Sequence, residues 1–494
     1  ELREVGDLIT YNLNIRQFVQ DLIERCTDVA LLKSFWFNLA GRLPRKSNER
    51  FRHGLSVLDP TCGSGAFLFA ALNILKPLYD ATLRTLHAVR NDALIASERS
   101  SPEKWAEVDE ILSRFATEKT DRAQSYAVIK HIIVNNLYGV DIEEQATEIA
   151  KLRLFLKLVA LLEPGDDIEP LPDIDFNIRH GNTLVGYATA EETERAVRGG
   201  GNAPMTQTTN MFSDAWEDIR LRLIAVEQQY NNFQIQQVQR GGHVSPADKQ
   251  ALDNTLHDLE ETLNHHLARE YGVNPRVTGK YQAWKASHQP FHWFVDFYPL
   301  MAAGGFDAVI GNPPYIEYSK VKSDYEIRTP SISLDAGNLF AYTTERCFEL
   351  SAPAALIGMI VPVSLVSTQR MQPLQDLVSQ SGRGWFSNYG ERPAKLFSGA
   401  EVLLTILIAS KESVSRGRYS TGLRKWSSDQ RDSLFATTSY LLSPSLARSF
   451  IVPKFAHSVE GEILRKIWSR TERLSSYLRK DTDSRLFYRI GGGR

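Results

Sequence analysis

The sequence lacks the features that mark several specialised classes of protein. Only three of its 494 residues are cysteine (Cys26, Cys62 and Cys347), too few and too scattered for a disulfide framework or a CxxC metal site. No apolar run reaches the ~18–20 residues that a membrane helix needs, and no signal peptide opens the chain. We therefore expect a cytoplasmic protein that stays reduced and makes no membrane contact.

The composition is that of an ordinary globular protein. Hydrophobic residues make up 43% of the chain and charged residues 23%, which excludes disordered and fibrous classes. At roughly 150 residues per domain, this length predicts several domains. The chain starts at Glu1 without Met and ends in a Gly-Gly-Gly-Arg tail, so we expect that an upstream segment and part of the last domain are missing.

The charges are unevenly distributed. Residues 411–494 hold 17 lysines and arginines against 8 acidic residues, a net +9, whereas the rest of the chain carries a net −11. A basic end on an acidic body favours a phosphate-contacting segment beside a separate catalytic core. The candidate phosphate contacts are Arg424, Lys425, Arg465, Lys466, Arg479 and Lys480.

Alternating strand and helix signals predict an α/β domain. After helical spacing in residues 1–50 comes a buried strand (55–60), a glycine turn (61–65) and a helix (66–76) that Pro77 should end, which is how nucleotide-binding α/β units begin. Further elements are expected at residues 78–130 (mostly helical), 136–141 (strand), 143–163 (helix), 176–185 (third sheet element), 306–311, 355–361 and 402–409 (strands).

A helical hairpin interrupts this alternation. Apolar residues recur three and four apart in two runs, and Ser245 and Pro246 can cap and start the second helix. The seam consists of Trp216, Ile219, Leu223, Val226, Tyr230, Phe233, Leu252, Leu256, Leu259 and Leu263. The predicted division is an N-terminal helical segment (1–50), a catalytic domain (51–196 and 291–415), the hairpin insertion (197–290) and the start of a basic domain (416–494).

The glycine turn and two acids indicate a nucleotide that carries an amino acid. Gly63 and Gly65 let a ligand approach the backbone, and Asp59 at a strand end suits an ammonium better than a phosphate. Asp141, at the next strand end, can accept ribose hydroxyls, although it follows Asp59 by far more than the usual ~20 residues. The alternatives are a structural turn and a surface acid.

The sharpest motif is Asn312-Pro313-Pro314-Tyr315, directly after a hydrophobic strand. The Asn312 side-chain oxygen and a proline carbonyl are fixed acceptors for the two hydrogens of an amino group, and Tyr315 offers a flat face on which a base can stack. Holding the amine in this way prepares its nitrogen to attack a methyl donor. The alternative is a proline-stiffened turn with a core tyrosine.

With these motifs the chain resembles the gamma class of amino-group DNA methyltransferases, which use S-adenosylmethionine. Residues 59–67, 138–141 and 312–315 are similar to motifs I, II and IV, and the resemblance covers roughly residues 50–410. It is most similar to the methyltransferase regions of large single-chain restriction-modification enzymes and of phage-defence systems of the BREX and DISARM kind. The resemblance implies a Rossmann-like sheet with an antiparallel seventh strand, the start of a C-terminal target-recognition domain, and methylation of N6 of an adenine flipped out of double-stranded DNA.

The resemblance also assigns roles to single residues. It implies that S-adenosylmethionine is held by Asp59, Thr61, Gly63, Gly65, Phe67, Asp141, Ile142, Asn182 and Phe340. It implies that Asn312, Pro313, Pro314 and Tyr315 bind the target adenine and that Phe397 covers its other face, with Trp385, Phe386 and Tyr389 as alternatives. The family's motif X has no clear match unless residues 7–11 replace it. No metal is expected, because His265 and His266 lack the HExxH pattern.

Two rival functions stay open. An asparagine-proline-proline-tyrosine turn would polarise a glutamine side-chain amide equally well, so a protein glutamine-N5 methyltransferase is the enzyme alternative. The other is a methyltransferase-like DNA-recognition subunit that needs a partner for activity. Further restriction or defence subunits are expected as partners in either DNA-related case.

Overall fold

The structure is a computed structural model that describes residues 4–44, 51–95, 102–115, 121–162, 171–198, 209–238, 244–328, 331–397, 399, 401–412, 416–443 and 451–470. Its helices are α1 (Val5–Thr10), α2 (Ile15–Glu24), α3 (Val29–Ala40), α4 (Ala66–Ile95), α5 (Pro102–Phe115), α6 (Asp121–Asn136), α7 (Glu144–Val159), α8 (Ala190–Val197), α9 (Thr209–Val238), α10 (Pro246–Glu270), α11 (Thr278–His288), α12 (Trp293–Asp296), α13 (Tyr298–Ala302), α14 (Leu339–Leu350), α15 (Gln372–Ser381) and α16 (Ser458–Trp468). Its strands are β1 (Val57–Asp59), β2 (Leu137–Asp141), β3 (Ile178–His180), β4 (Phe306–Gly311), β5 (Ser351–Pro362), β6 (Arg383–Tyr389), β7 (Leu404–Ser410), β8 (Gly417–Arg424) and β9 (Leu441–Leu442).

One sheet runs through the molecule in the order β3-β2-β1-β4-β5-β7-β6-β8-β9. The strands β3, β2, β1, β4 and β5 are parallel to their neighbours, and β7 lies antiparallel between β5 and β6. This confirms the predicted Rossmann-like sheet with an antiparallel seventh strand. The short parallel strands β1, β2, β3 and β4 therefore all end at the same edge of the sheet.

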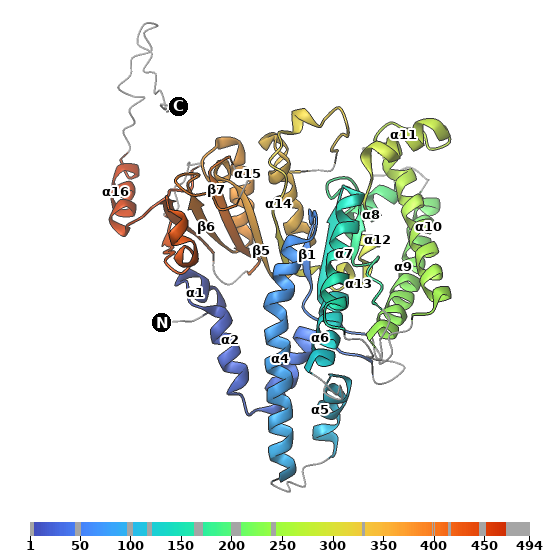
Figure 1. Ribbon diagram of the computed structural model, residues 1–494. Helices are drawn as coiled ribbons and strands as arrows, with labels where there is room; N and C mark the ends of the chain where they lie inside the picture. The colour runs from blue at the N-terminus through green and yellow to red at the C-terminus, as the bar shows by residue number, and fades with distance from the viewer. Residues whose placement is uncertain are drawn as a thin grey trace.

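Both faces of the sheet are covered, because neighbouring residues of its central strands point to opposite sides. Val57 and Leu137 face a cluster that holds the buried sides of α3, α4 and α6. Leu58 and Tyr138 face a second cluster, built from α12 to α15. The result is a three-layer α/β domain (Figure 1), which leaves the ends of the parallel strands, rather than their faces, available for a ligand.

The predicted helical hairpin is present. Helices α9 and α10 pack against each other, and all ten predicted seam residues are buried in one cluster. That cluster also contains Phe176 and Val185 from the strand β3 region, so the hairpin covers the β3 end of the sheet (Figure 1). Ser245 is the N-cap residue of α10 and Pro246 follows it, but the Ser245 side chain makes no capping hydrogen bond.

Helix α4 corrects the prediction that Pro77 ends a helix at residue 76. The helix continues to Ile95 with Pro77 in its interior, because Leu75, Tyr79, Leu83 and Leu86 lie on one buried stripe that crosses the proline. Burying such a stripe offsets the ~3 kcal/mol that an internal proline costs. The segment Ala66–Ala93 also has the length and mean hydropathy (1.2) of a possible membrane span, which the sequence reading did not foresee; here it packs as a core helix.

Other elements differ from their predicted extents. The third sheet element is only Ile178–His180 instead of residues 176–185, and α7 ends at Val159. Strand β6 was not predicted, because its residues are buried on both faces and show no alternation. Strand β8 pairs with β6, and β9 pairs with β8, so residues 417–442 continue the same sheet.

Candidate functional site

The predicted site residues converge at the carboxyl edge of the parallel strands. Asp59 ends β1, Asp141 ends the neighbouring β2, and Asn182 follows β3. On the other side of β1, Asn312 follows β4, and a Cβ added at Gly311 would lie 3.0 Å from Asp59 Oδ1. Four segments far apart in the sequence thus place their polar residues along one edge.

The glycine turn after β1 adopts a conformation that favours glycine. Gly63 and Gly65 have φ angles of +50° and +80°. The Gly63 N–H donates to Asp141 Oδ2 at 2.7 Å, which ties the turn to the end of β2. A Cβ at Gly63 would meet nothing within 4 Å, whereas one at Gly65 would lie 3.1 Å from Ala150 Cβ. The turn is therefore open at Gly63 and packed against α7 at Gly65.

Arg153 is a residue of this site that the sequence reading missed. From α7 its Nη1 donates to Ser64 O at 2.6 Å and to Ser64 Oγ at 3.1 Å, inside the glycine turn. Its guanidinium also lies 4.8 Å from the centre of the Phe69 ring. The sequence offered only a basic residue late in a helix, a position that the helix dipole already explains.

Three polar groups at this edge are buried. The pKa of Asp59 is raised to about 8, mainly by burial, with a smaller contribution from the nearby Asp141 carboxylate and against the opposing effect of the Thr61 N–H. Thr61 Oγ1 and Asn182 Nδ2 are buried and have no hydrogen-bond partner among the described residues. Buried polar groups left unpaired are costly, so a ligand that offered partners to these groups would be stabilised at this edge.

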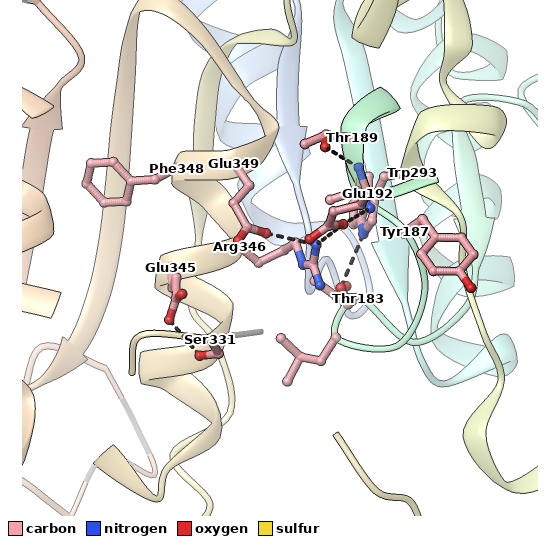
Figure 2. A network of polar contacts seen from close by, with 12 residues as sticks. Thr183, Tyr187, Thr189, Glu192, Trp293, Ser331, Glu345, Arg346, Phe348 and Glu349 are labelled. Atoms are coloured by element: carbon pink, nitrogen blue, oxygen red, sulfur yellow. Dashed lines mark hydrogen bonds and ion pairs between the residues drawn. The ribbon is translucent and has the colours of Figure 1, made fainter. Parts of the chain in front are cut away.

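The turn around Asn182 is held by its neighbours. Asn182 Oδ1 accepts from Leu184 N at 3.0 Å, which leaves the amide Nδ2 free to donate. The next residue, Thr183, donates its hydroxyl to the Pro60 carbonyl. The Thr183 carbonyl accepts from Trp293 Nε1 at 3.2 Å (Figure 2). The hydrogen bond from Thr183 to Pro60 thereby ties the turn after β3 to the end of β1.

The turn that follows β4 has an internal contact that its motif did not reveal. The Tyr315 hydroxyl contacts Asn312 Oδ1 and lies 2.9 Å from Ile360 O on β5. Asn312, Pro314 and Tyr315 are half-buried, and Pro313 is buried. The tyrosine therefore orients the Asn312 side-chain oxygen and is itself anchored to the neighbouring strand.

The apolar residues assigned to the cofactor surround these turns. Phe340, in the first turn of α14, is 1% exposed and meets the Tyr315 ring edge-on, with 6.5 Å between ring centres. Phe67 is half-buried at the start of α4, and Ile142 is half-buried after β2, where its carbonyl oxygen lies 3.0 Å from His180 Nε2. Among these three residues, Phe340 is the one with a ring contact to Tyr315 in the turn after β4.

Phe397 lies in the loop between β6 and β7, half-buried. The start of β7 pairs with the end of β5, so this loop is at the same sheet edge as the site. Arg431 donates to the carbonyls of Lys395 and Leu396 and thereby holds the loop. The alternatives Trp385, Phe386 and Tyr389 lie on β6 and are at most 1% exposed, so they belong to the core.

Two other sequence-based assignments are changed by the structure. Arg424 was a candidate phosphate contact, but its guanidinium donates to Leu434 O, Thr437 Oγ1 and Thr438 Oγ1. Lys425, Arg465 and Lys466 are exposed, and Arg479 and Lys480 lie outside the described residues. Asp7, in the proposed substitute for motif X, pairs with Arg383 on β6, four strands from β1, so this segment does not reach the glycine turn.

A layer of paired charges supports the site from α14. Glu345 accepts from the backbone of Ile332 and Ser333 and from the Ser331 hydroxyl, at 2.7–2.9 Å (Figure 2). Arg346 is 4% exposed and pairs with Glu349 at 2.8 Å and Glu192 at 3.7 Å. Glu345, Arg346 and Glu349 line a cavity of about 20 Å³.

Together, the strand order, the reversed β7 and the glycine turn define a Rossmann-like methyltransferase that uses S-adenosylmethionine. The residues present fit this cofactor, because the edge combines a buried carboxyl, an open glycine backbone, an acid at the end of β2 and an unpaired amide donor. Among the described residues, no group of three or more histidine, cysteine or acidic side chains could hold a metal ion.

Comparison with known proteins shows which family of methyltransferases the chain belongs to. Residues 135–382 match the Eco57I restriction-modification methylase family, and residues 45–162 match the DNA-methyltransferase domain of MmeI. The chain therefore belongs to the Eco57I restriction-modification methylase family.

Individual relatives are similar over part of their length. A protein of Methanocaldococcus jannaschii described as a type II restriction enzyme and methyltransferase is 29% identical over 294 residues, which is 53% of this chain and 22% of that protein. Distant structural likenesses are the type ISP restriction-modification enzyme LlaGI (13% identity, 86% of this chain and 30% of that one, TM-score 0.36) and the type IIL enzyme MmeI (12%, 89% and 39%, TM-score 0.34). The chain thus spans about a fifth of the curated relative that it matches.

Proposed function

We propose that this chain transfers the methyl group of S-adenosylmethionine to N6 of an adenine that is flipped out of double-stranded DNA. Its membership of a restriction-modification methylase family supports a DNA substrate. The choice of an amino group rests on one observation. The Asn312 side-chain oxygen, oriented by Tyr315, lies at the end of β4, directly beside the strand that carries the glycine turn.

The cofactor's methionine end would lie at the glycine turn. Asp59 would accept its ammonium group, and the open backbone at Gly63 would leave room for it. Asp141 would accept the ribose hydroxyls with lone pairs not used by Gly63 N. The unpaired Asn182 Nδ2 would donate to a nitrogen of the adenine ring, which Ile142 and Phe340 would flank. Thr61 and Phe67 would complete the pocket, and Gly65 would keep the turn close to α7.

The target base would lie at the turn after β4. Its exocyclic amine would donate one hydrogen to Asn312 Oδ1 and the other to the Pro313 carbonyl. Tyr315 would stack on one face of the base and Phe397 would cover the other, while Pro314 keeps the turn rigid. Accepting both hydrogens would increase the electron density on nitrogen and aim its lone pair towards the cofactor pocket.

When bound at this edge, S-adenosylmethionine would supply an electrophilic methyl group, and its sulfonium sulfur would be the leaving group as the amine nitrogen takes the methyl carbon. The protein's part is alignment and polarisation. Asn312 and Pro313 stabilise the positive charge that develops on the amine, whose extra proton then leaves to solvent. No residue of the turn needs to form a covalent bond with the base.

The test is a methyl-transfer assay with tritiated S-adenosylmethionine, unmodified genomic DNA and a protein extract as parallel substrates. We expect label in N6-methyladenine with the wild type and a loss of about 100- to 1000-fold for Asn312→Ala, as when one key hydrogen-bonding group is removed from other active sites. Asn274→Ala, in an exposed turn after α10, is the matched control and should keep full activity.

Each other outcome points to a different reading. Label in N4-methylcytosine would contradict adenine specificity, and label in protein would favour the glutamine-N5 alternative. Cofactor binding without any transfer would favour a DNA-recognition subunit that depends on a partner. Activity of Asn312→Ala equal to that of Asn274→Ala would contradict the assigned base pocket.

The domain division and the setting of the protein are proposals as well. We propose residues 51–196 and 291–415 as the catalytic domain, with 1–50 and 197–290 as helical additions and 416–494 as the start of a target-recognition region that grows from the sheet through β8. We further propose action in the cytoplasm, with other restriction or defence components as partners.

A further inference from the structure

Two short segments that flank the proposed base and cofactor pockets pair with each other. Glu317, two residues after Tyr315, forms an isolated antiparallel bridge with Asn338, the N-cap of α14. Tyr318 N donates to Gly337 O and Leu339 N donates to Ile316 O, each at 2.9 Å. The backbone that leaves the base-binding turn is thus joined to the backbone that leads into Phe340.

The Glu317 carboxylate joins a third segment to this bridge. Arg370, in the short 3-10 helix η4 (Gln369–Met371) after β5, donates Nη2 to Oε1 at 2.7 Å and Nη1 to Oε2 at 3.2 Å. Asn338 Nδ2 also donates to Oε1 at 3.3 Å, while its Oδ1 accepts from Phe340 N at 3.3 Å. The hydrogen bonds from Arg370 keep the pKa of Glu317 below its usual value.

We propose that Glu317 and Arg370 are positioning residues that hold the base pocket and the cofactor pocket in register. The proposal rests on the proposed function, since both pockets belong to it. The pair connects the two pockets because Tyr315 is held at two points. Its hydroxyl hydrogen-bonds to the Ile360 carbonyl on β5, and the chain that follows it is held by the Glu317 bridge, whose carboxylate binds Arg370 after β5. Without the carboxylate, the bridge would keep its backbone hydrogen bonds but lose its connections to Arg370 and to the Asn338 side chain.

This ion pair contributes little to the global stability of the protein. The side chains of Arg370 and Glu317 are 43% and 40% exposed, and ion pairs at such exposure contribute at most about 1 kcal/mol to folding. A displacement of the reacting groups by about 1 Å, however, can cost 100-fold in rate. The pair should therefore affect catalysis more than stability.

The chain offers a matched control. Arg328 and Glu326 form an ion pair at 2.9 Å with the same exposures, 43% and 40%, in the same connection between β4 and α14. Arg328 also donates to Glu270 O on the hairpin side, and neither residue bridges to Asn338. Glu326→Gln thus removes an equally exposed ion pair without touching the proposed join.

The experiment compares the wild type with Glu317→Gln, Arg370→Ala, Arg370→Lys and Glu326→Gln. Hydrogen exchange should speed up about tenfold at the Tyr318 and Leu339 amides in the first two variants, with a melting temperature like that of Glu326→Gln. Their kcat should fall about tenfold or more while KM for DNA stays within about twofold of the wild-type value. Arg370→Lys, which keeps the charge but loses the two-pronged contact, should lie between.

The readouts separate the two hypotheses. If the wild type transfers no methyl group to DNA, the proposed function fails, and hydrogen exchange still reports on the join. Unchanged exchange and unchanged kcat in Glu317→Gln would overturn the proposal. Equal effects in Glu326→Gln, or a loss of activity that only follows a loss of folded protein, would overturn it too.

Discussion

Two groups of buried polar side chains differ in one respect. At the carboxyl ends of β1 and β3, Thr61 Oγ1 and Asn182 Nδ2 are buried and lack partners among the described residues, and the buried Asp59 carboxyl accepts a hydrogen bond from the Thr61 N–H at 3.1 Å. On α14, Glu345 is also buried, but it has several donors around it. An unpaired group costs stability and a paired group contributes to it, so the first set is explained by a ligand and the second by the fold.

The largest expected effect is a loss of cofactor affinity at Asp59, and it tests whether this first set of side chains serves a ligand. Asp59→Asn removes the carboxylate proposed to hold the cofactor's ammonium, and affinity for S-adenosylmethionine should fall by about 100-fold, since truncating one member of a buried charge pair costs about 2–5 kcal/mol. Isothermal titration calorimetry measures it. In the wild type at pH 7 it should also show release of a proton on binding, because burial raises the Asp59 pKa to about 8. If the wild type and Asp59→Asn bound S-adenosylmethionine equally well, the ammonium group would have to bind elsewhere.

The same variant should be more stable without ligand. Because the folded-state pKa of Asp59 lies above its ordinary value of 3.8, its contribution to stability is complete below about pH 4 and is lost as the pH rises towards 8. At pH 8, Asp59→Asn should therefore raise the free energy of unfolding by about 2 kcal/mol or more. Urea denaturation at pH 5 and pH 8 checks this, and a destabilised variant would contradict it.

Glu345 should behave in the opposite way. Glu345→Ala leaves the Ile332 and Ser333 N–H groups and the Ser331 hydroxyl without their buried acceptor, so we expect a loss of about 3 kcal/mol in the free energy of unfolding. Thermal denaturation of the ligand-free protein measures the loss. A neutral result would show that α14 needs no such network.

A smaller effect is expected at Thr61. Thr61→Val removes an unpaired hydroxyl at nearly constant volume, so the free energy of unfolding should rise by about 1 kcal/mol while cofactor affinity falls by about tenfold, as for one hydrogen bond. Denaturation and cofactor titration on the same sample separate the two quantities. A clear loss of stability would place Thr61 with the structural set.

The smallest expected effect concerns two adjacent basic residues, one exposed on the protein surface and one bonded within the fold. Lys425 is exposed, whereas the adjacent Arg424 is used within the fold. Lys425→Ala should reduce the slope of log affinity for DNA against log salt by about 0.9 without changing stability, and Arg424→Ala should lower the melting temperature. DNA binding at several salt concentrations distinguishes them, and an unchanged slope would remove Lys425 from the interface.

Much of the site could be predicted because its motifs are local. Strand, glycine turn and helix follow one another in residues 55–76, and Asn312 to Tyr315 directly follow a hydrophobic strand. Strand β6 and the continuation of α4 through Pro77 could not be predicted, because burial on both faces and a stripe of tertiary contacts override the local signals.

The sequence by itself determined the class of chemistry, methyl transfer from S-adenosylmethionine, since the residues proposed to hold the cofactor and the target amino group stand in short, ordered motifs. Only the tertiary structure decided which polar groups stay unpaired, that Tyr315 is anchored to Ile360 on β5, and that Glu317 meets both Arg370 and Asn338. The physical reason is separation along the chain. Hydrogen bonds between residues tens of positions apart depend on strand order and helix packing, which no local pattern encodes.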